Sequence, residues 1–201
     1  VVTNPAFINK NYDFLNNLKY IPSVKNKKFS AVISNKNFGH GYQQRRLFLI
    51  KMASMYPNLC DIYGKGWGNE LGTSYKGELE CYHTKNDKSD GKFPALINYN
   101  YSLCIENCSK KNYFTEKFTD CILSWCIPIY YGCTNISEYF PEGSYYEIDI
   151  TNSNCIENII NIINTPISQK NIEALKEARD LVMNKYNVWS SIESVINNKT
   201  L

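Results

Sequence analysis

The sequence lacks several features that would assign it to a class of protein at once. No apolar run approaches the length of a membrane span, and the N-terminus does not have the pattern of a signal peptide. The net charge is only +3, without a basic block or an RNA-binding signature, so nucleic acid is not an expected partner. Neither a nucleophile elbow nor a G-x-G-x-x-G fingerprint is present. The remaining composition, 43% hydrophobic and 20% charged residues, is that of an ordinary globular protein.

Metal-ligand patterns are also scarce. The eight cysteines form no C-x-x-C pair, and only two histidines are present to complete a mixed site, so no metal site is expected. Four N-x-S/T sequons occur, at Asn100, Asn107, Asn135 and Asn198. Two of them lie within or beside the motif described below, where a glycan would obstruct a site. These observations favour a reducing, cytoplasmic location, with the Golgi lumen as the alternative if the chain is a trimmed ectodomain.

Strands and helices are expected to alternate along the chain. The expected strands are 28–34, 59–64, 101–107, 127–132 and 144–150. The expected helices are 12–18, 42–56, 92–100, 115–126, 154–164 and 168–196, the last with a break near Tyr186, and residues 65–91 are expected to form a long loop. The alternation predicts an α/β fold with a Rossmann-like parallel sheet and helices on both faces. Residues 1–27 are expected to be a linker or helix, and residues 28–201 one domain with a C-terminal helix.

The loops that follow the strands are the expected ligand site, because open sheets of this class bind ligands at the carboxyl ends of their strands. The loop after Ser34 contains the glycines of "GHG" and leads into a helix whose first turn is expected to carry Arg45 and Arg46. Glycine backbone before a helix N-terminus can cradle an anion, and arginine can bind phosphate through two hydrogen bonds. The local sequence alone favours a plainer reading, a turn followed by a solvated basic face, because the full phosphate-loop spacing is absent.

The segment "NYFTEKFTDCILSWCIPIYYG" (112–132) raises a second question. Thr115 is a good N-cap for the helix that follows, and an apolar stripe at helical spacing is expected to be core: Phe114, Phe118, Cys121, Ile122 and Trp125. Glu116 and Lys117 lie off this stripe at the helix mouth. The positive end of the helix dipole disfavours a cation, so Lys117 is either a solvated side chain or a ligand of an anion. Asn107 ends the preceding strand and is expected to point into the same crevice.

The stretch of residues 98–146 resembles the donor-binding motif of glycosyltransferase family 10, the α-1,3/1,4-fucosyltransferases. Here "SLCIENCSKKNYFTEK" matches the family pattern ending in F-E-N-S and Y-x-T-E-K, and "IPIYYG" matches V-P-V-x-x-G. Upstream, "KFSAVISN", an arginine near position 45 and "CDIYG" match in order and approximate spacing. The resemblance therefore extends over nearly all of the chain after residue 27.

The resemblance implies a GT-B fold, in which this chain corresponds to the C-terminal, donor-binding half. It implies an inverting transfer of a sugar, with fucose from GDP-fucose the expected donor, to a glycan hydroxyl. Carried over by motif, Arg45 or Arg46 and Lys117 would face the diphosphate and stabilise the leaving group without a metal, and Glu116 would bind the ribose. The remaining residues expected to bind the donor are Asn35, Tyr63, Gly64, Asn107 and Tyr113, with the "CDIYG" turn near the base.

The sequence departs from the family pattern in places. Ile105 and Cys108 replace an aromatic and a hydroxyl residue, and Trp125 occupies a position that is usually small. The family's general base belongs to an N-terminal acceptor domain, which residues 1–27 cannot form. The chain is therefore expected to bind a donor and to transfer little alone, with an acceptor domain as a partner. Two alternatives stay open: a nucleotide-sugar binding module without catalysis, and a GT-B transferase that uses a different donor.

Overall fold

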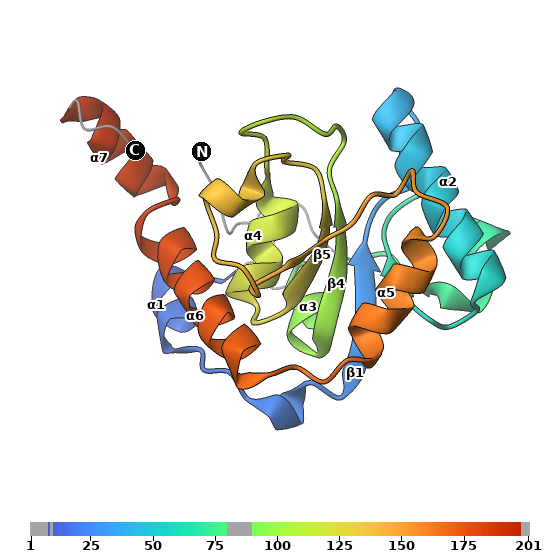
Figure 1. Cartoon of the computed structure of the whole chain (residues 1–201), viewed down its shortest axis with the longest axis horizontal. Coiled ribbons are helices and arrows are strands. Elements are labelled where there is room, and N and C mark those ends of the chain that lie inside the picture. The colour runs from blue at the N-terminus through green and yellow to red at the C-terminus, as the bar shows by residue number, and fades with distance from the viewer. Residues whose placement is uncertain (1–7, 9, 80–89, 198–201) are drawn as a thin grey trace.

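A computed structural model describes residue 8 and residues 10–79 and 90–197, which contain a six-stranded parallel sheet in the order β3-β2-β1-β4-β5-β6 (Figure 1). The strands are β1 (Lys27–Val32), β2 (Asp61–Tyr63), β3 (Tyr75–Gly77), β4 (Tyr99–Ile105), β5 (Ile127–Tyr131) and β6 (Tyr146–Glu147). This is the strand order of a Rossmann-like sheet, so the predicted fold class is confirmed.

Helices connect and cover the strands. The α-helices are α1 (Tyr12–Asn17), α2 (His40–Met55), α3 (Pro94–Ile97), α4 (Glu116–Leu123), α5 (Cys155–Asn164), α6 (Gln169–Asn184) and α7 (Val188–Ile196). Short 3₁₀ segments in the described part of the chain include η2 (Pro22–Val24), η3 (Asn69–Ser74) and η4 (Ile136–Glu138). In Figure 1, α3, α4 and α6 lie on one side of the sheet, and α2 and α5 lie on the other. No helix in the described part of the chain is long and apolar enough to cross a membrane.

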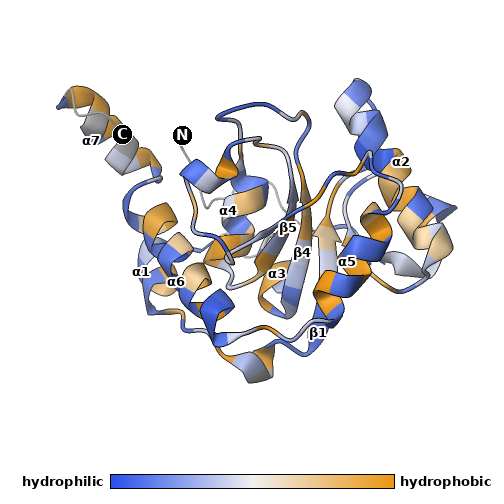
Figure 2. Ribbon diagram, in the orientation of Figure 1, coloured by the Kyte–Doolittle hydropathy of each residue, from blue (hydrophilic) through white to orange (hydrophobic). Residues whose placement is uncertain are grey.

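The core lies between these layers. Central strands β4 and β5 are buried almost throughout, as expected of parallel strands covered on both faces. All five residues of the apolar stripe expected around 115–126 are buried, which confirms their assignment to the core. Phe118 packs against the rings of Tyr130 and Phe140, with both centroid distances at 4.8 Å. Figure 2 shows both hydrophobic and hydrophilic residues along α5 and α6, as expected of helices with one packed and one solvated face.

Several element boundaries differ from the sequence-based prediction. The expected loop 65–91 contains η3 and β3 within its described part, because β3 is only three residues long and gives no readable alternation. The expected strand 144–150 is shortened to the two residues of β6. Helix α2 starts at His40, so Arg45 and Arg46 lie in its second turn rather than its first. The break expected near Tyr186 is confirmed, since α6 ends at Asn184 and Asn187 caps α7.

Helix α4 ends three residues earlier than predicted. Trp125 adopts a left-handed backbone conformation with φ of 56°, which turns the chain from the helix into β5. The indole is buried, and its Nε1 donates to the carbonyl of Leu18 at 2.8 Å. Arg179 of α6 lies over the indole ring, with its Cζ 4.5 Å from the ring centroid. The N-terminal segment and α6 therefore meet at the C-terminal end of α4.

Candidate functional site

The carboxyl edge of the sheet opens between β1 and β4, where the strand order reverses. The loop after β1 leads to α2, and the loop after β4 leads to α4. The first turn of α2 touches the loop after β4 at Gly41, since a Cβ added there would lie 1.7 Å from the carbonyl oxygen of Asn107. Only glycine fits at this contact, which brings the first turn of α2 against the end of β4.

Arg45 is a buried cation at this edge. Its side chain comes from the second turn of α2, and the residue is only 4% exposed. Its Nη1 donates to Oδ1 of Asn107 at 2.9 Å, and its Cζ lies 5.0 Å from the centroid of the Tyr42 ring. No carboxylate within the described ranges lies within 4.0 Å of this guanidinium. Burial lowers the pKa of Arg45, as expected for a cation taken out of water, although the charges of Glu106 and Glu116 act in the opposite direction.

Lys117 lies across the crevice on the first turn of α4. Its Nζ donates to Oε2 of Glu106 and to Oγ1 of Thr115, each at 3.1 Å. Glu106 is fully buried and also accepts from the backbone N–H and the hydroxyl of Thr115, both at 2.8 Å. The dipole problem posed by Lys117 thus has an answer within the chain, because a buried carboxylate neutralises the ammonium group. The lysine side chain keeps 19% exposure.

Glu116 and Tyr113 lie in the same electrostatic environment. Burial acts to raise the pKa of Glu116, but the charges of Lys117 and Lys92 outweigh it and leave that pKa below its ordinary value. The Glu116 carboxylate is therefore ionised and able to accept hydrogen bonds near neutral pH. Burial raises the pKa of Tyr113, and the charges of Glu106 and Glu116 act in the same direction. Tyr113 is half-buried and therefore remains a neutral hydroxyl at this edge.

Arg46 points elsewhere, although it is adjacent to Arg45. Its Nε donates to Oδ1 of Asn35 at 2.7 Å, and its Nη2 forms an ion pair with Oε1 of Glu70 at 3.1 Å. Asn35 in turn donates to the carbonyl of Gly66 at 2.9 Å. The structure therefore separates the two arginines, placing Arg45 beside Asn107 and leaving Arg46 to tie the loop after β1 to the segment after β2.

The residues of the "CDIYG" turn also differ in where they point. Gly64 lies at the carboxyl edge with φ of 150°, and a Cβ added there would lie 2.1 Å from the carbonyl oxygen of Ile33. The Tyr63 hydroxyl lies 2.9 Å from the hydroxyl of Tyr99, which donates to Oδ2 of Asp61 at 2.7 Å. Since Tyr99 begins β4 and Asp61 begins β2, the Tyr63 hydroxyl points away from the carboxyl edge.

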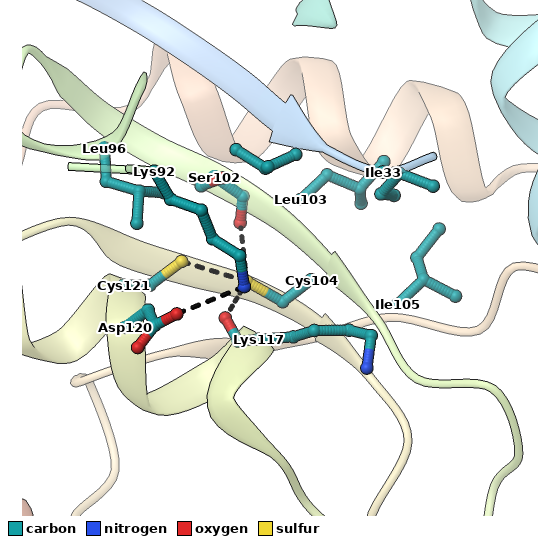
Figure 3. A pocket seen from close by; sticks show the side chains of 11 residues that line it. Ile33, Lys92, Leu96, Ser102, Leu103, Cys104, Ile105, Lys117, Asp120 and Cys121 are labelled. Carbon is teal, nitrogen blue, oxygen red and sulfur yellow. Dashed lines mark hydrogen bonds and ion pairs between the residues drawn. The ribbon is translucent and has the colours of Figure 1, made fainter. Parts of the chain in front are cut away.

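Sequence reasoning missed four residues of this site: Tyr42, Lys92, Glu106 and Asp120. Tyr42 accepts a hydrogen bond from Nδ2 of Asn107 at 3.0 Å. Glu106 stands in the motif quoted from the sequence. A charged residue at the end of an apolar strand, directly before Asn107, was the signal that could have identified it. Lys92 and Asp120 line a cavity of about 20 Å³ beneath the site, which has room for about one or two water molecules (Figure 3). No group of three or more His, Cys, Asp or Glu residues in the described segments could hold a metal ion.

The fold is that of the C-terminal half of a GT-B glycosyltransferase. A UDP-forming alpha,alpha-trehalose-phosphate synthase from Burkholderia xenovorans superposes with a TM-score of 0.60 over 98% of this chain and 50% of that chain, at 10% identity. An alpha1,3-fucosyltransferase superposes with a TM-score of 0.50 over 88% of this chain and 47% of that chain, at 23% identity. The chain thus spans half or less of the length of each enzyme.

The chain belongs to glycosyltransferase family 10. The family model described as "Glycosyltransferase family 10 (fucosyltransferase) C-term" matches residues 22–170. An alpha-(1,3)-fucosyltransferase from Helicobacter pylori is 34% identical over 67 residues, which are 33% of this chain and 13% of that protein. An alpha-(1,4)-fucosyltransferase from Arabidopsis thaliana is 36% identical over 50 residues, which are 25% of this chain and 12% of that protein. The predicted family membership is confirmed.

Proposed function

We propose that this chain is the donor-binding half of an inverting fucosyltransferase and binds GDP-fucose at the carboxyl edge of β1 and β4. Arg45 and Lys117 would hold the diphosphate, Glu116 would accept hydrogen bonds from the ribose hydroxyls, and Asn107 and Tyr113 would line the pocket. The Gly64 turn would lie near the base. Membership of the fucosyltransferase family supports this choice of donor.

One observation carries the proposal: Arg45 is buried, and its hydrogen-bond partner Asn107 is neutral. Glu106 and Glu116 act on Arg45 electrostatically without forming an ion pair with it. A buried charge without a direct ion-pair partner is costly, and an anionic ligand would supply that partner. Lys117 is different, because the carboxylate of Glu106 already balances its charge. Lys117 would therefore help to orient the diphosphate, while Arg45 would supply the net positive charge that attracts it. The bound diphosphate would therefore depend most strongly on Arg45.

The same cations suit the chemistry of transfer. When the bond between fucose and the diphosphate breaks, negative charge grows on the leaving phosphate, and fixed cations stabilise it most in that state. The proposal includes no resident metal, because Arg45 and Lys117 take that role. The base that activates the acceptor hydroxyl would come from an acceptor-binding domain, as the family resemblance implies. Transfer would then require both halves and a glycan acceptor.

The proposed location is the cytoplasm. The side chain of Asn107 bonds to Arg45 and Tyr42, and Asn135 is buried with Oδ1 accepting from the backbone of Asn112 at 2.8 Å. A glycan on either sequon would break these contacts, which favours a compartment without N-glycosylation over the Golgi lumen. Secretion of the chain from a eukaryotic cell, followed by glycosidase treatment, tests this: modification at Asn107 together with retained nucleotide binding would contradict it.

Calorimetric titration with GDP, GDP-fucose and UDP tests the function. We expect binding of both guanosine ligands, weaker binding of UDP, and a loss of at least about tenfold in GDP affinity in Arg45→Gln. Arg46→Gln is the matched control, since Arg46 pairs with Glu70, and it should change the affinity little. Preferential UDP binding would favour a different donor, and failure to bind any nucleotide would reject the proposal. Binding without transfer in the presence of an acceptor domain would leave the non-catalytic binding module.

A further inference from the structure

Lys92 joins two acidic residues of α4 from outside that helix. Its Nζ lies 3.1 Å from Oδ2 of Asp120 and 3.7 Å from Oε1 of Glu116. Lys92 precedes α3, and its side chain extends to α4, which covers the same side of the sheet. Figure 3 shows Lys92 and Asp120 pointing toward each other at the cavity that both line. The Lys92 side chain is only 12% exposed. It therefore lies beneath the proposed ribose-binding carboxylate rather than in solvent.

The arrangement is unfavourable for α4 unless a cation is present. Glu116 and Asp120 are four residues apart, so their carboxyl groups lie on the same helix face and repel each other once both are ionised. Asp120 is 1% exposed, and no group in the described part of the chain donates to its Oδ1. An apolar residue at position 120 would avoid this cost. Stability alone therefore does not explain the Lys92–Asp120 pair, whereas a role in orienting Glu116 would.

Above about pH 7, where Asp120 is ionised, the charges form an alternating series that ends at the site. It runs from Asp120 to Lys92, Glu116, Lys117 and Glu106, with each neighbouring pair of charged atoms between 3.1 and 3.8 Å apart. Glu116 therefore has a cation on each side, Lys92 at 3.7 Å and Lys117 at 3.8 Å. Lys117 is shared with Glu106, whereas Lys92 contacts Glu116 from the side of the cavity. Lys92 is therefore the contact that holds the Glu116 carboxylate on that side.

We propose that Lys92 is a positioning residue that holds the Glu116 carboxylate toward the ribose of the bound nucleotide, with Asp120 as its anchor. The inference rests on the proposed function. A carboxylate held in one orientation accepts hydrogen bonds from both neighbouring ribose hydroxyls, so the site distinguishes a ribonucleotide from its deoxy analogue. Without Lys92, Glu116 turns toward Lys117 and water, and this distinction is lost. Lys92 thus sets sugar specificity without touching the nucleotide.

The experiment compares the dissociation constants of GDP and 2′-deoxy-GDP at a pH above 7, where Asp120 is ionised. For the unaltered chain we expect about tenfold weaker binding of the deoxy analogue, the usual effect of losing a hydrogen bond to a charged group. The ratio of the two constants should fall toward one in Lys92→Met and Glu116→Gln, and Lys92→Arg should restore much of it. Lys76→Met is the matched control, because Lys76 pairs with Asp61 and should leave the ratio unchanged.

The outcomes separate the two proposals. Failure of the unaltered chain to bind GDP, or a ratio that Glu116→Gln leaves unchanged, rejects the nucleotide site as assigned. A ratio sensitive to Glu116→Gln but equal in Lys92→Met and the unaltered chain overturns the role of Lys92. Equal weakening of both ligands by Lys92→Met also overturns it, because a purely structural role predicts that result. If Lys92→Met does not fold, Asp120→Asn decides by the same ratio, which should fall if the anchor matters.

Discussion

The ammonium nitrogen of Lys117 lies 3.1 Å from Oε2 of Glu106, a side chain with no exposed surface. The pair spans the end of β4 and the start of α4, so it fixes the helix mouth against the sheet. Thr115 lies between the two residues, donating to Glu106 and accepting from Lys117. The two partners are unequal, because Glu106 has other donors in the chain and Lys117 also faces solvent.

The pair predicts a loss of stability when either partner is replaced. Glu106→Gln should lower the free energy of unfolding by about 2 kcal/mol or more, because the new amide cannot accept from both Thr115 donors and from Lys117. Lys117→Met should cost at least as much stability, because it leaves the fully buried Glu106 carboxylate without its cation, and it should also weaken GDP binding. Urea denaturation of both variants measures the stabilities. A Lys117→Met variant as stable as the unaltered chain would contradict the arrangement described.

Arg45 should stabilise the complex at the expense of the free protein. Arg45→Met removes a buried charge whose nearest hydrogen-bond partner is an amide, so the free chain should gain about 1 kcal/mol in unfolding free energy. The same variant should lose the rise in Tm that GDP produces in the unaltered chain. Thermal denaturation with and without GDP measures both effects.

The neighbouring arginine provides the control for this trade-off. Arg46→Met breaks the ion pair with Glu70 and the hydrogen bond to Asn35, so it should not stabilise the free chain. It should retain the rise in Tm with GDP. A less stable free chain in Arg45→Met than in Arg46→Met would show that Arg45 is already compensated within the protein.

Asp120 should make stability depend on pH in an unusual direction. Burial raises the pKa of Asp120 from its ordinary 3.8 to about 7, although Lys92 acts to lower it. Between these two values the folded chain keeps a proton that the unfolded chain has released, so this group lowers stability as pH rises. Asp120→Asn removes the effect, and its stability relative to the unaltered chain should therefore increase between about pH 4 and about pH 7.

Asp149→Asn is the control with the opposite sign. Hydrogen bonds from the hydroxyl and the backbone N–H of Thr151 lower the pKa of Asp149, so its ionised form is favoured in the folded chain. The stability of this variant relative to the unaltered chain should fall as pH rises from below the ordinary pKa. Chemical denaturation across this range compares the variants. A pH-independent difference for Asp120→Asn would contradict a buried, proton-binding carboxyl group.

Local patterns predicted most of the fold. The long apolar runs of β4 and β5 and the capped stripe of α4 were readable because periodicity survives over their length. Strand β3 was not, since three residues carry no period, and η3 contains Gly72 in a non-helical conformation. The end of α4 was missed because Trp125 is large and apolar, and its left-handed backbone depends on contacts with Leu18 and Arg179.

The candidate site was predictable where its residues follow strands that the sequence pattern indicates. Arg45, Asn107 and Lys117 are brought to one edge as expected, because they follow strands whose carboxyl ends meet there. The separation of Arg46 from Arg45 could not be read locally, since it depends on Glu70 of the next βα segment. Lys92 was also invisible, because its partners on α4 lie more than twenty residues further along the chain.

The contacts that hold Trp125 determine whether the motif can work outside this domain. Leu18 bonds to its indole from the N-terminal segment, and Arg179 covers the ring from α6. The C-terminal end of α4 is thus held in place by two segments that lie far from the motif in sequence. Grafting residues 98–146 into another α/β scaffold would transfer the side chains of the candidate site without the support that sets the direction of the helix. The motif is therefore a signature of the whole domain and not a portable binding cassette.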